Sequence, residues 1–492
     1  MNGGRSGPWD AIVVGAGTAG IPCAVEAAAR GARVLVLEKA ERIGGTLWVT
    51  GGHLSGGGTR RQRERGIVDS PQAHYEDVLR VSHDTVVPEI ARLACEEAPH
   101  TLDWLDELGF PWEPETPALV YGHEPYRVPR TVWGANAGRD ILETIRPLWD
   151  EQVAAGRIEL LLGARLTDLV VEAGAVVGVR AEGPGSAVAE HRAPAVALTA
   201  GGYAAAHDFY PSVTPGSPRL VSVAPPSSTG DGIHAARRSS GAGFRGAEKF
   251  LPTAFGIERP PGSGRSDFWD GWPAVVAHFR PPREIYVNDA GLRFLNEDDE
   301  SPHRREEVIM ELPDNRWWIV FDEAAIDAGD PVVNFWSHER VREEARRGEV
   351  VWRADTLEEL ARATGVIDPV GLVETVAGWN ALVERGGPDP LGRSVLGPKL
   401  ETAPFYALLN RATTFISFGG LAVDTELRVL DEAGAPIPGL FAAGEIVGAG
   451  ATSGNAFCSG MLVTPALSFG RRLGRALGEV AAGLPAPFAK SA

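Results

Sequence analysis

The sequence contains very little cysteine and no long apolar run. Its three cysteines, Cys23, Cys95 and Cys458, lie far apart among 492 residues and show no CxxC spacing. This excludes a disulfide framework, a redox-active cysteine pair and an ordinary zinc site, and we predict no metal. No stretch approaches the roughly 20 consecutive apolar residues that a membrane-spanning helix requires. We therefore expect no membrane-embedded segment.

Basic residues are also in deficit. There are 47 Lys and Arg against 65 Asp and Glu, so the formal net charge is -18. Negative charge repels phosphate backbones and anionic lipid surfaces, and we expect neither nucleic acid nor membrane as a partner. The first ten residues lack the basic and apolar regions of a secretory signal, which predicts a cytoplasmic protein. The length and the apolar fraction of 44% predict a globular chain of two or three domains.

The N-terminal part carries a dinucleotide-binding pattern. A β-branched run, AIVV, ends in glycines, and an Ala-rich helix and a second buried strand follow. Gly15, Gly17 and Gly20 stand in GxGxxG, where they permit the tight turn, the approach of a pyrophosphate and close helix packing. Glu38 ends the second strand, where a carboxylate can accept hydrogen bonds from a ribose. The whole pattern predicts a dinucleotide site.

The glycines after Glu38 favour a flavin over a nicotinamide dinucleotide. Gly44, Gly45 and the pair Gly51 and Gly52 follow almost at once. A flavin lying extended across a protein needs several close backbone approaches, although a flexible glycine loop is the alternative. No second GxGxxG follows a strand, so we expect electrons to pass through the substrate and an external acceptor or donor. This absence and the missing cysteine pair argue against the two-nucleotide disulfide reductases.

The middle of the chain differs in composition from both ends. Residues 71–110 show helical periodicity with Gly109 as the stop, and residues 157–202 resemble a small β-meander ending in a buried strand. Between about 250 and 390, Trp, Pro and charged residues accumulate, in WDGWPAVVAHF for example, and glycine-rich segments then return. We predict one domain made of residues 1–250 and 391–492, with an α+β domain of residues 251–390 inserted.

The motifs, in this order, resemble the FAD-binding fumarate reductase and succinate dehydrogenase flavoproteins and their relatives, the 3-ketosteroid dehydrogenases. The matching pieces are DAIVVGAGTAG with Glu38, GGTLWVTGG, ALTAGGY, STGDGI, AGLRFLNED, FGGLAVD, PIPGLFAAGE and TPALSFGRRLG. The resemblance implies an α/β fold with a Rossmann-like FAD-binding domain of the GR2 type, built from both chain ends, and an inserted α+β capping domain. It also implies action on CH–CH or C=C bonds beside a carbonyl.

The resemblance assigns the cofactor contacts residue by residue. They are Gly15, Gly17, Thr18, Ala19, Gly20, Glu38, Lys39, Gly44, Gly45, Thr46, Thr50, Gly51, Gly52, Ala200, Gly201, Asp231, Gly444, Glu445, Gly460, Leu462 and Val463. Asp231 either faces the cofactor or, like Thr229, caps the helix after STGDG. Quinone-linked members attach FAD through a His just before the Thr of the early loop. Gly45 stands there in this sequence, so we predict that FAD is bound without a covalent bond.

The catalytic acid or base is less clearly marked. Desaturation beside a carbonyl needs a side-chain acid or base and a group that stabilises the developing enolate. In fumarate reductases an arginine shortly after RFxNE transfers the proton, and the nearest candidates here are Arg304 and Arg305, with Tyr286 and His303 as substitutes. The alternative is that both arginines pair with the two glutamates that follow them on a solvated helix face.

Other residues, together with His303, are candidates for contacting the substrate. Tyr126, a further candidate for the catalytic group, and Arg130 lie in a proline-rich loop of polar aromatics and cations that either lines a site or is plain surface. Arg411 either holds a substrate carbonyl or carboxylate or is an ordinary charge at a strand end. Phe418 and Phe457 stand where the two familiar subgroups carry a histidine-rich lead and a tyrosine. The departures weaken both a dicarboxylate and a steroid as substrate.

Three functions remain open from the sequence. The first is a FAD-dependent dehydrogenase (desaturase) of a cyclic or hydrophobic ketone, with hydride passing to flavin N5 and a small carbonyl compound as partner. The second is a fumarate-type ene-reductase of an unsaturated acid. The third is a flavin-binding module without turnover of its own. The sequence does not indicate which oligomeric state the protein adopts.

Overall fold

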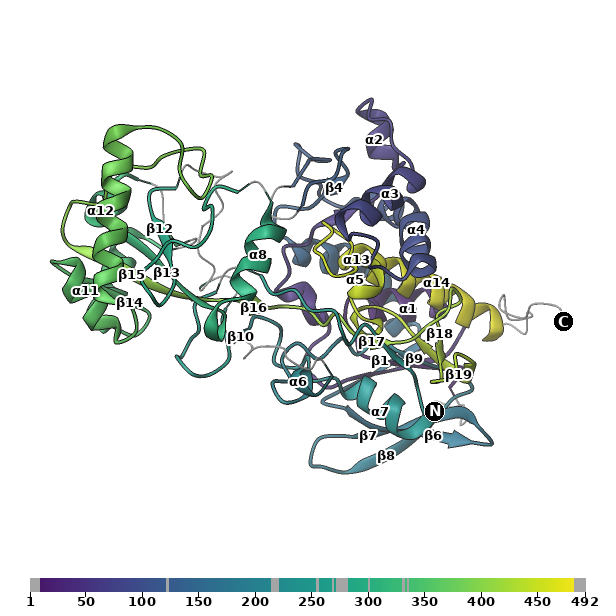
Figure 1. Ribbon diagram of the computed structural model, residues 1–492. Helices are drawn as coiled ribbons and strands as arrows, with labels where there is room; N and C mark the ends of the chain where they lie inside the picture. Colours follow the sequence, from purple (N-terminus) through teal and green to yellow (C-terminus); the bar gives the residue numbers. More distant parts are fainter. Residues whose placement is uncertain are drawn as a thin grey trace.

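The glycine motifs lie on a six-stranded sheet that both ends of the chain build (Figure 1). The computed structural model describes residues 9–120, 124–213, 221–253, 256–267, 270, 282–299, 301–329, 332–333 and 336–481. The strands, in sheet order, are β18 (Arg428–Leu430), β19 (Pro436–Ala442), β9 (Val196–Leu198), β1 (Ala11–Val14), β2 (Val34–Glu38) and β5 (Ile158–Leu162). All neighbours from β19 to β5 run parallel, and β18 is antiparallel to β19. The predicted α/β fold is confirmed.

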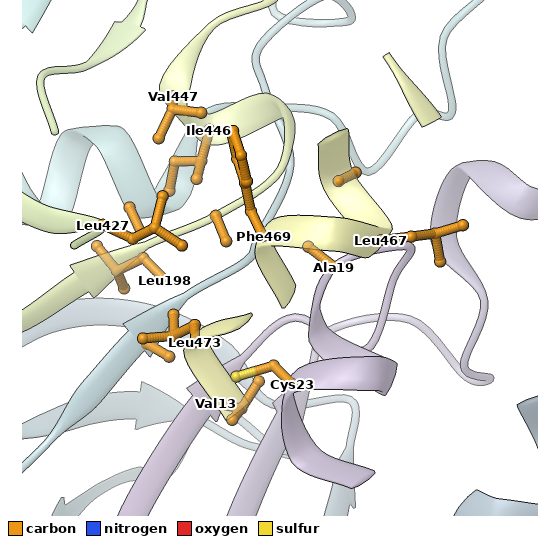
Figure 2. Packing of buried hydrophobic residues seen from close by; sticks show 14 of the residues in the cluster. Val13, Ala19, Cys23, Leu198, Leu427, Ile446, Val447, Leu467, Phe469 and Leu473 are labelled. Carbon is orange, nitrogen blue, oxygen red and sulfur yellow. The ribbon is translucent and has the colours of Figure 1, made fainter. Parts of the chain in front are cut away.

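The first and last helices of this domain pack closely against each other. α1 (Gly20–Ala29) lies beside α14 (Val463–Ala481) because two glycines of α14 leave no side chain at the contact. An added Cβ at Gly470 would lie 2.2 Å from the Ala19 carbonyl oxygen, and one at Gly474 would lie 2.3 Å from that of Cys23. Figure 2 shows Leu473 of α14 in the same buried cluster as Cys23. The C-terminal helix thus covers the start of the dinucleotide unit.

Helices and short strands surround this sheet. The predicted helical stretch of residues 71–110 is confirmed, and Gly109 has a φ of 79° just beyond its end. The elements are β3 (Leu54–Ser55), α2 (Arg60–Glu64), α3 (Pro71–Val81), α4 (Pro88–Glu107), β4 (Thr131–Val132), α5 (Gly138–Ala154), α6 (Phe209–Val213), β10 (Val221–Ser222), α7 (Asp231–Ser240), β11 (Phe244–Arg245), β16 (Thr413–Thr414), β17 (Gly420–Leu421) and α13 (Gly450–Ser453).

The meander expected over residues 157–202 is only partly present. Its first strand, β5, joins the parallel sheet beside β2, and its last, β9, lies at the centre of that sheet. Only β6 (Arg165–Glu172), β7 (Ala175–Glu182) and β8 (Val188–Arg192) form an antiparallel three-stranded sheet. The alternation of apolar residues does not distinguish a strand that pairs with its neighbour in sequence from one that pairs across the domain.

The second body is a four-stranded antiparallel sheet with helices. In sheet order its strands are β12 (Ile285–Val287), β13 (Arg316–Asp322), β15 (Phe405–Arg411) and β14 (Val351–Ala354). Its helices are α8 (Pro302–Met310), α9 (Glu323–Asp327), α10 (His338–Arg347), α11 (Leu357–Thr364) and α12 (Pro369–Arg385). β15 comes from beyond residue 390, and the exact domain boundaries stay a prediction. Figure 1 shows α8 between this sheet and the six-stranded one.

Parts of two motifs fall outside the described residues. They are residues 121–123 of the proline-rich loop and, except for Asp270, the WDGWPAVVAHF segment. Within the described parts of the chain, no helix is long and apolar enough to cross a membrane.

Candidate active site

A cavity of about 630 Å³ lies at the carboxyl ends of the parallel strands and reaches α8. Ligands of open α/β sheets bind at this edge, where the connecting loops diverge. Of the residues assigned to the cofactor from the sequence, all but Gly20 and Gly44 line the cavity. Those two lie just behind it and shape the turns. An added Cβ at Gly20 would lie 1.8 Å from the Gly15 carbonyl oxygen, and Gly44 has a φ of 118°.

The glycine turn fits the pyrophosphate of a dinucleotide. Gly17, Thr18 and Ala19 line the cavity immediately before helix α1. The helix start has neither a side-chain cap nor an acidic residue in its first turn, so no side chain competes with an anion at this end of the helix. An added Cβ at Gly51 meets no atom within 4 Å, so the cavity comes directly up to this backbone. The residues present therefore fit FAD.

Glu38 fixes the glycine turn from the next strand. Its Oε2 accepts a hydrogen bond from the Ala16 N–H and its Oε1 accepts one from the Ala40 N–H, each at 2.8 Å. The side chain is nearly buried and still lines the cavity. The carboxylate thus holds the turn and remains available on its cavity side for a ribose hydroxyl.

Asp231 faces this end of the cavity and does not cap its helix. The N-cap of α7 is Gly230, with no side-chain hydrogen bond, so the capping interpretations of Asp231 and Thr229 are wrong. Instead, Lys39 Nζ donates to Thr229 Oγ1 at 2.6 Å and to Asp231 Oδ2 at 2.8 Å. The three side chains form a polar cluster beside Glu38.

Glu445 connects two glycine-rich segments that line the cavity. Its Oε1 accepts hydrogen bonds from the Ser417 N–H at 2.9 Å and from Ser417 Oγ at 3.0 Å. Burial raises the pKa of this carboxyl, and the two Ser417 hydrogen bonds offset part of that effect. The contact holds the strand-end segment before Gly419 against the turn that follows Gly444.

The cavity lining outside the glycine motifs is aromatic and acidic. Phe415 and Phe457 stack with ring centroids 5.2 Å apart, and both line the cavity. Its carboxylates are Asp267 and Glu306. Its other lining residues outside the glycine motifs include Val120, Trp133, Thr253, Gly256, Ser266, Thr413 and Ile416. This surface suits an apolar molecule with few polar groups.

Basic side chains are scarce around the cavity. Among the lining residues that the structure describes, only Lys39 and His53 carry a basic side chain. Lys39 is paired with Asp231. The His53 ring lies 5.1 Å from the Trp133 ring, and burial lowers the pKa of His53, which keeps it neutral. Within the described lining, no free cation is available for a carboxylate substrate.

Glu306 is the titratable group that projects from α8 into the cavity. Its side chain is 4% exposed. Burial raises its pKa well above the usual range, the positive charge of Arg305 lowers it, and the charges of Glu124 and Glu307 raise it further. Sequence reasoning treated Glu306 only as a partner for the arginines. Its place directly after the Arg pair was the one indication available.

The residues predicted to be catalytic do not reach the cavity lining. Arg304 is exposed and pairs with Asp299. Arg305 is buried, with no hydrogen-bond partner for its Nε and Nη1. Tyr286 packs in the core of the four-stranded sheet, with its ring 4.6 Å from that of Trp317. Arg304, Arg305 and Tyr286 lie outside the lining because their side chains leave α8 and β12 in directions other than toward the cavity.

Three residues predicted to bind substrate are engaged elsewhere. Arg130 is fully buried outside the cavity lining, and its guanidinium donates to the carboxylates of Asp69 and Asp77. His303 lies outside the lining and pairs with an exposed glutamate of α8. Arg411 pairs with Glu258 at 3.2 Å.

Two aromatic candidates and one tyrosine complete the comparison. Phe457 lines the cavity as expected, and Phe418 lies behind it with ring centroids 5.8 Å apart. Tyr126 is buried outside the lining and donates to the Ser459 carbonyl oxygen. Sequence reasoning missed His53 and Phe415, although His53 directly follows the Gly51–Gly52 pair.

A known family matches almost all of the chain. The family described as FAD binding domain matches residues 10–462. The chain belongs to this FAD-binding family. The predicted resemblance and the predicted FAD-binding fold are thereby confirmed, and FAD is its cofactor.

Known members of the family act on several kinds of compound. "Fumarate reductase (cytochrome)" of Shewanella frigidimarina is 26% identical over 94% of this chain and 76% of its own length. "4-Oxocyclohexanecarboxylate 2-dehydrogenase" of Sinomonas cyclohexanicum is 28% identical over 96% of this chain and 94% of its own. The structure of 3-ketosteroid-Δ4-(5α)-dehydrogenase from Rhodococcus jostii RHA1 has a TM-score of 0.68 at 25% identity, covering 97% of this chain and 98% of its own. The prediction of a FAD-dependent oxidoreductase acting on CH–CH or C=C bonds is confirmed at this level.

Proposed function

We propose that this protein is a FAD-dependent dehydrogenase that introduces a C=C bond beside the carbonyl of a neutral, apolar compound. The observation that carries the proposal is the cavity lining outside the glycine motifs, which includes the Phe415–Phe457 stack and the carboxyl of Glu306. An anionic substrate would find no free cation among the described lining residues. Burying an unpaired carboxylate is costly, so a neutral ketone fits this lining better.

The similarity to two relatives supports a ketone. One is named for 4-oxocyclohexanecarboxylate, a ketone that also carries a carboxylate, and the other for 3-ketosteroids; both are dehydrogenases, and only the second name supports a neutral ketone. The similarity to a fumarate reductase supports the alternative, an ene-reductase of an unsaturated acid. The described lining lacks the cations that such an acid requires. A cavity that extends beyond the cofactor motifs argues against a flavin-binding module without turnover.

Glu306 is the group that we assign to proton transfer. Bound FAD would supply the acceptor for the hydride that leaves one carbon of the substrate. Glu306 then accepts the proton from the neighbouring carbon, next to the carbonyl, and the two C–H bonds are replaced by the C=C bond. A carboxylate whose pKa is raised by burial is a stronger base than an exposed one, which suits this step. The buried charge of Arg305 stabilises the carboxylate form.

The aromatic pair orients the substrate, and the cofactor is held without a covalent bond. Phe415 and Phe457 offer a flat apolar surface to a ring and exclude water from it. Gly45 has no side chain that could form a bond to FAD. An external acceptor must remove the electrons, since no second nucleotide motif is present in the sequence. Location in the cytoplasm stays a prediction.

Two anaerobic assays test the proposal on the FAD-loaded protein. In the first, a neutral cyclic ketone is mixed with the protein and an artificial acceptor, and loss of flavin absorbance near 450 nm followed by acceptor reduction is measured. In the second, fumarate is mixed with the protein and reduced viologen. We expect turnover in the first assay and none in the second. Turnover of fumarate without turnover of ketone would overturn the assignment of a neutral substrate.

A further inference from the structure

The segment Cys458 to Val463 lines the cavity and leads into helix α14. Cys458, Gly460, Met461, Leu462 and Val463 all contribute to the lining. Ser459 is the exception in this run and is turned away from the cavity. The cavity-facing geometry of the segment therefore depends on what holds Ser459 from behind.

Two buried side chains hold Ser459. The Tyr126 hydroxyl donates to the Ser459 carbonyl oxygen at 2.7 Å, across 333 positions in the sequence. Thr131 Oγ1 donates to Ser459 Oγ at 3.1 Å. Both bonds are buried, where a hydrogen bond competes with little water. Backbone and side chain of the same residue are thus fixed by two neighbouring parts of the 124–132 segment.

The residues that hold Ser459 are themselves fixed by a buried ion network. The Arg130 side chain is fully buried and pairs with Asp69 at 2.9 Å and with Asp77 at 2.7 Å. Its guanidinium carbon lies 4.9 Å from the centre of the Tyr126 ring. Asp77 also accepts a hydrogen bond from the Arg127 N–H at 2.9 Å. Tyr126 therefore sits on a segment with little freedom to move.

The other side of the segment leaves no room for adjustment. Gly460 has a φ of 75°, and an added Cβ there would lie 2.4 Å from the Ser55 backbone nitrogen. The Ser55 N–H donates to Thr464 Oγ1 at 2.9 Å, which ties the start of α14 to strand β3. The segment is held between β3 and the 124–132 segment, and a shift at Ser459 is transmitted to its neighbours on the cavity.

We propose that Tyr126 is a positioning residue that sets the cavity-facing shape of Cys458 to Val463, and through it the affinity and reduction potential of the bound FAD. Tyr126 is absent from the cavity lining, so it acts through the residues that its hydroxyl holds, Ser459 and Ser55. The role replaces the catalytic one predicted for Tyr126 from the sequence. It extends beyond the proposed reaction, because it concerns the cofactor and holds whatever the substrate is.

The test is a Tyr126→Phe variant, with Tyr75→Phe as its matched control. Both tyrosines are 5% exposed and lie in the same hydrophobic core outside the cavity lining, but the hydroxyl that donates to Ser459 is that of Tyr126. For Tyr126→Phe we expect the dissociation constant of FAD to rise about tenfold, because one buried hydrogen bond no longer holds the segment. Tyr75→Phe should bind FAD as the unmodified protein does. FAD binding is measured by fluorescence titration of the apoprotein.

The reduction potential of FAD distinguishes a residue that positions the cavity-facing segment from one that only stabilises the fold. The variant can weaken the binding of oxidised FAD and of reduced FAD by different factors. Each tenfold change in the ratio of the two dissociation constants shifts the two-electron midpoint potential by about 30 mV. We expect such a shift in Tyr126→Phe and a smaller one in Thr131→Val, which removes only the bond to Ser459 Oγ. A lower melting temperature with unchanged FAD affinity and unchanged potential in both variants would overturn the proposal, independently of any substrate assay.

Discussion

Arg305 and Glu306 are consecutive residues of α8, and only Glu306 lines the cavity. Arg305 lies buried behind it, 3% exposed, without a hydrogen-bond partner for its Nε and Nη1. Successive side chains of an α-helix point about 100° apart, so one helix can present a carboxyl to the cavity and keep a guanidinium in the protein. The positive charge of Arg305 therefore lies directly beside Glu306, the proposed proton acceptor, and favours its carboxylate form.

Replacing Glu306 tests the proton transfer. Glu306→Gln keeps the size of the side chain but cannot accept a proton, so turnover of the ketone should fall at least about 100-fold. FAD should remain bound, because Glu306 is outside the glycine motifs. Steady-state rates and the flavin absorbance measure the two effects. Glu307→Gln, the exposed neighbour on α8, is the control, and equal rates in the two variants would contradict the assignment.

Replacing Arg305 tests how the base is tuned. The charge of Arg305 lowers the pKa of Glu306, against burial and the charges of Glu124 and Glu307, which raise it. Without that charge, in Arg305→Met, the pKa of Glu306 rises further, and the acid limb of kcat/KM should move to higher pH. Arg305→Lys keeps the charge and should restore most of the original profile. An unchanged acid limb in Arg305→Met would show that the base titrating in the profile is another group.

The pH dependence of stability gives a test without substrate. The pKa of Glu306 is higher in the folded protein than its ordinary value of 4.5, so the folded state holds this proton more tightly than the unfolded state. Its contribution to stability is complete below pH 4.5 and is lost as the pH rises through the folded-state pKa. Glu306→Gln should therefore lose less melting temperature between pH 5 and pH 8 than the unmodified protein. An equal loss of melting temperature between pH 5 and pH 8 in the two proteins would contradict the raised pKa of Glu306.

The aromatic pair should set the apparent affinity for substrate. Phe457→Ala removes half of the stack with Phe415 and a large apolar surface, and KM for a cyclic ketone should rise about tenfold or more. The change in kcat should be smaller, because the proton acceptor is untouched. Phe110→Leu, in the core and outside the lining, is the control for general loosening. An unchanged KM in Phe457→Ala would place the substrate elsewhere.

The cofactor should leave the protein on denaturation. Gly45 lines the cavity with a φ of 50° and no side chain to attach FAD, so acid precipitation should release all of the flavin into the supernatant. Absorbance of the supernatant and the intact mass of the washed protein measure this. A protein mass increased by that of FAD would contradict non-covalent binding. Gly45→His should bind FAD more weakly, since an added Cβ there lies 3.1 Å from the Gly17 Cα.

The cofactor end of the cavity could be predicted from the sequence because its function resides in the backbone. At Gly15, Gly17 and Gly51 the absence of a side chain is itself the functional property, and a glycine is identified from the sequence alone. The strand, turn and helix around these glycines are formed by near neighbours in the chain. The same holds for Glu38, which the end of strand β2 places beside the turn.

The substrate end required the tertiary structure, because there the environment of a side chain decides its role. The sequence suggests that Arg130 binds substrate, but in the structure its guanidinium forms an ion pair with Asp69, 61 residues earlier. Tyr126 is joined to Ser459 across 333 positions. Glu306 looked like an ordinary partner for its neighbouring arginines until the turn of α8 placed it in the cavity. The sequence alone determined the fold family and the cofactor, and long-range packing decided which polar groups are free to act on a substrate.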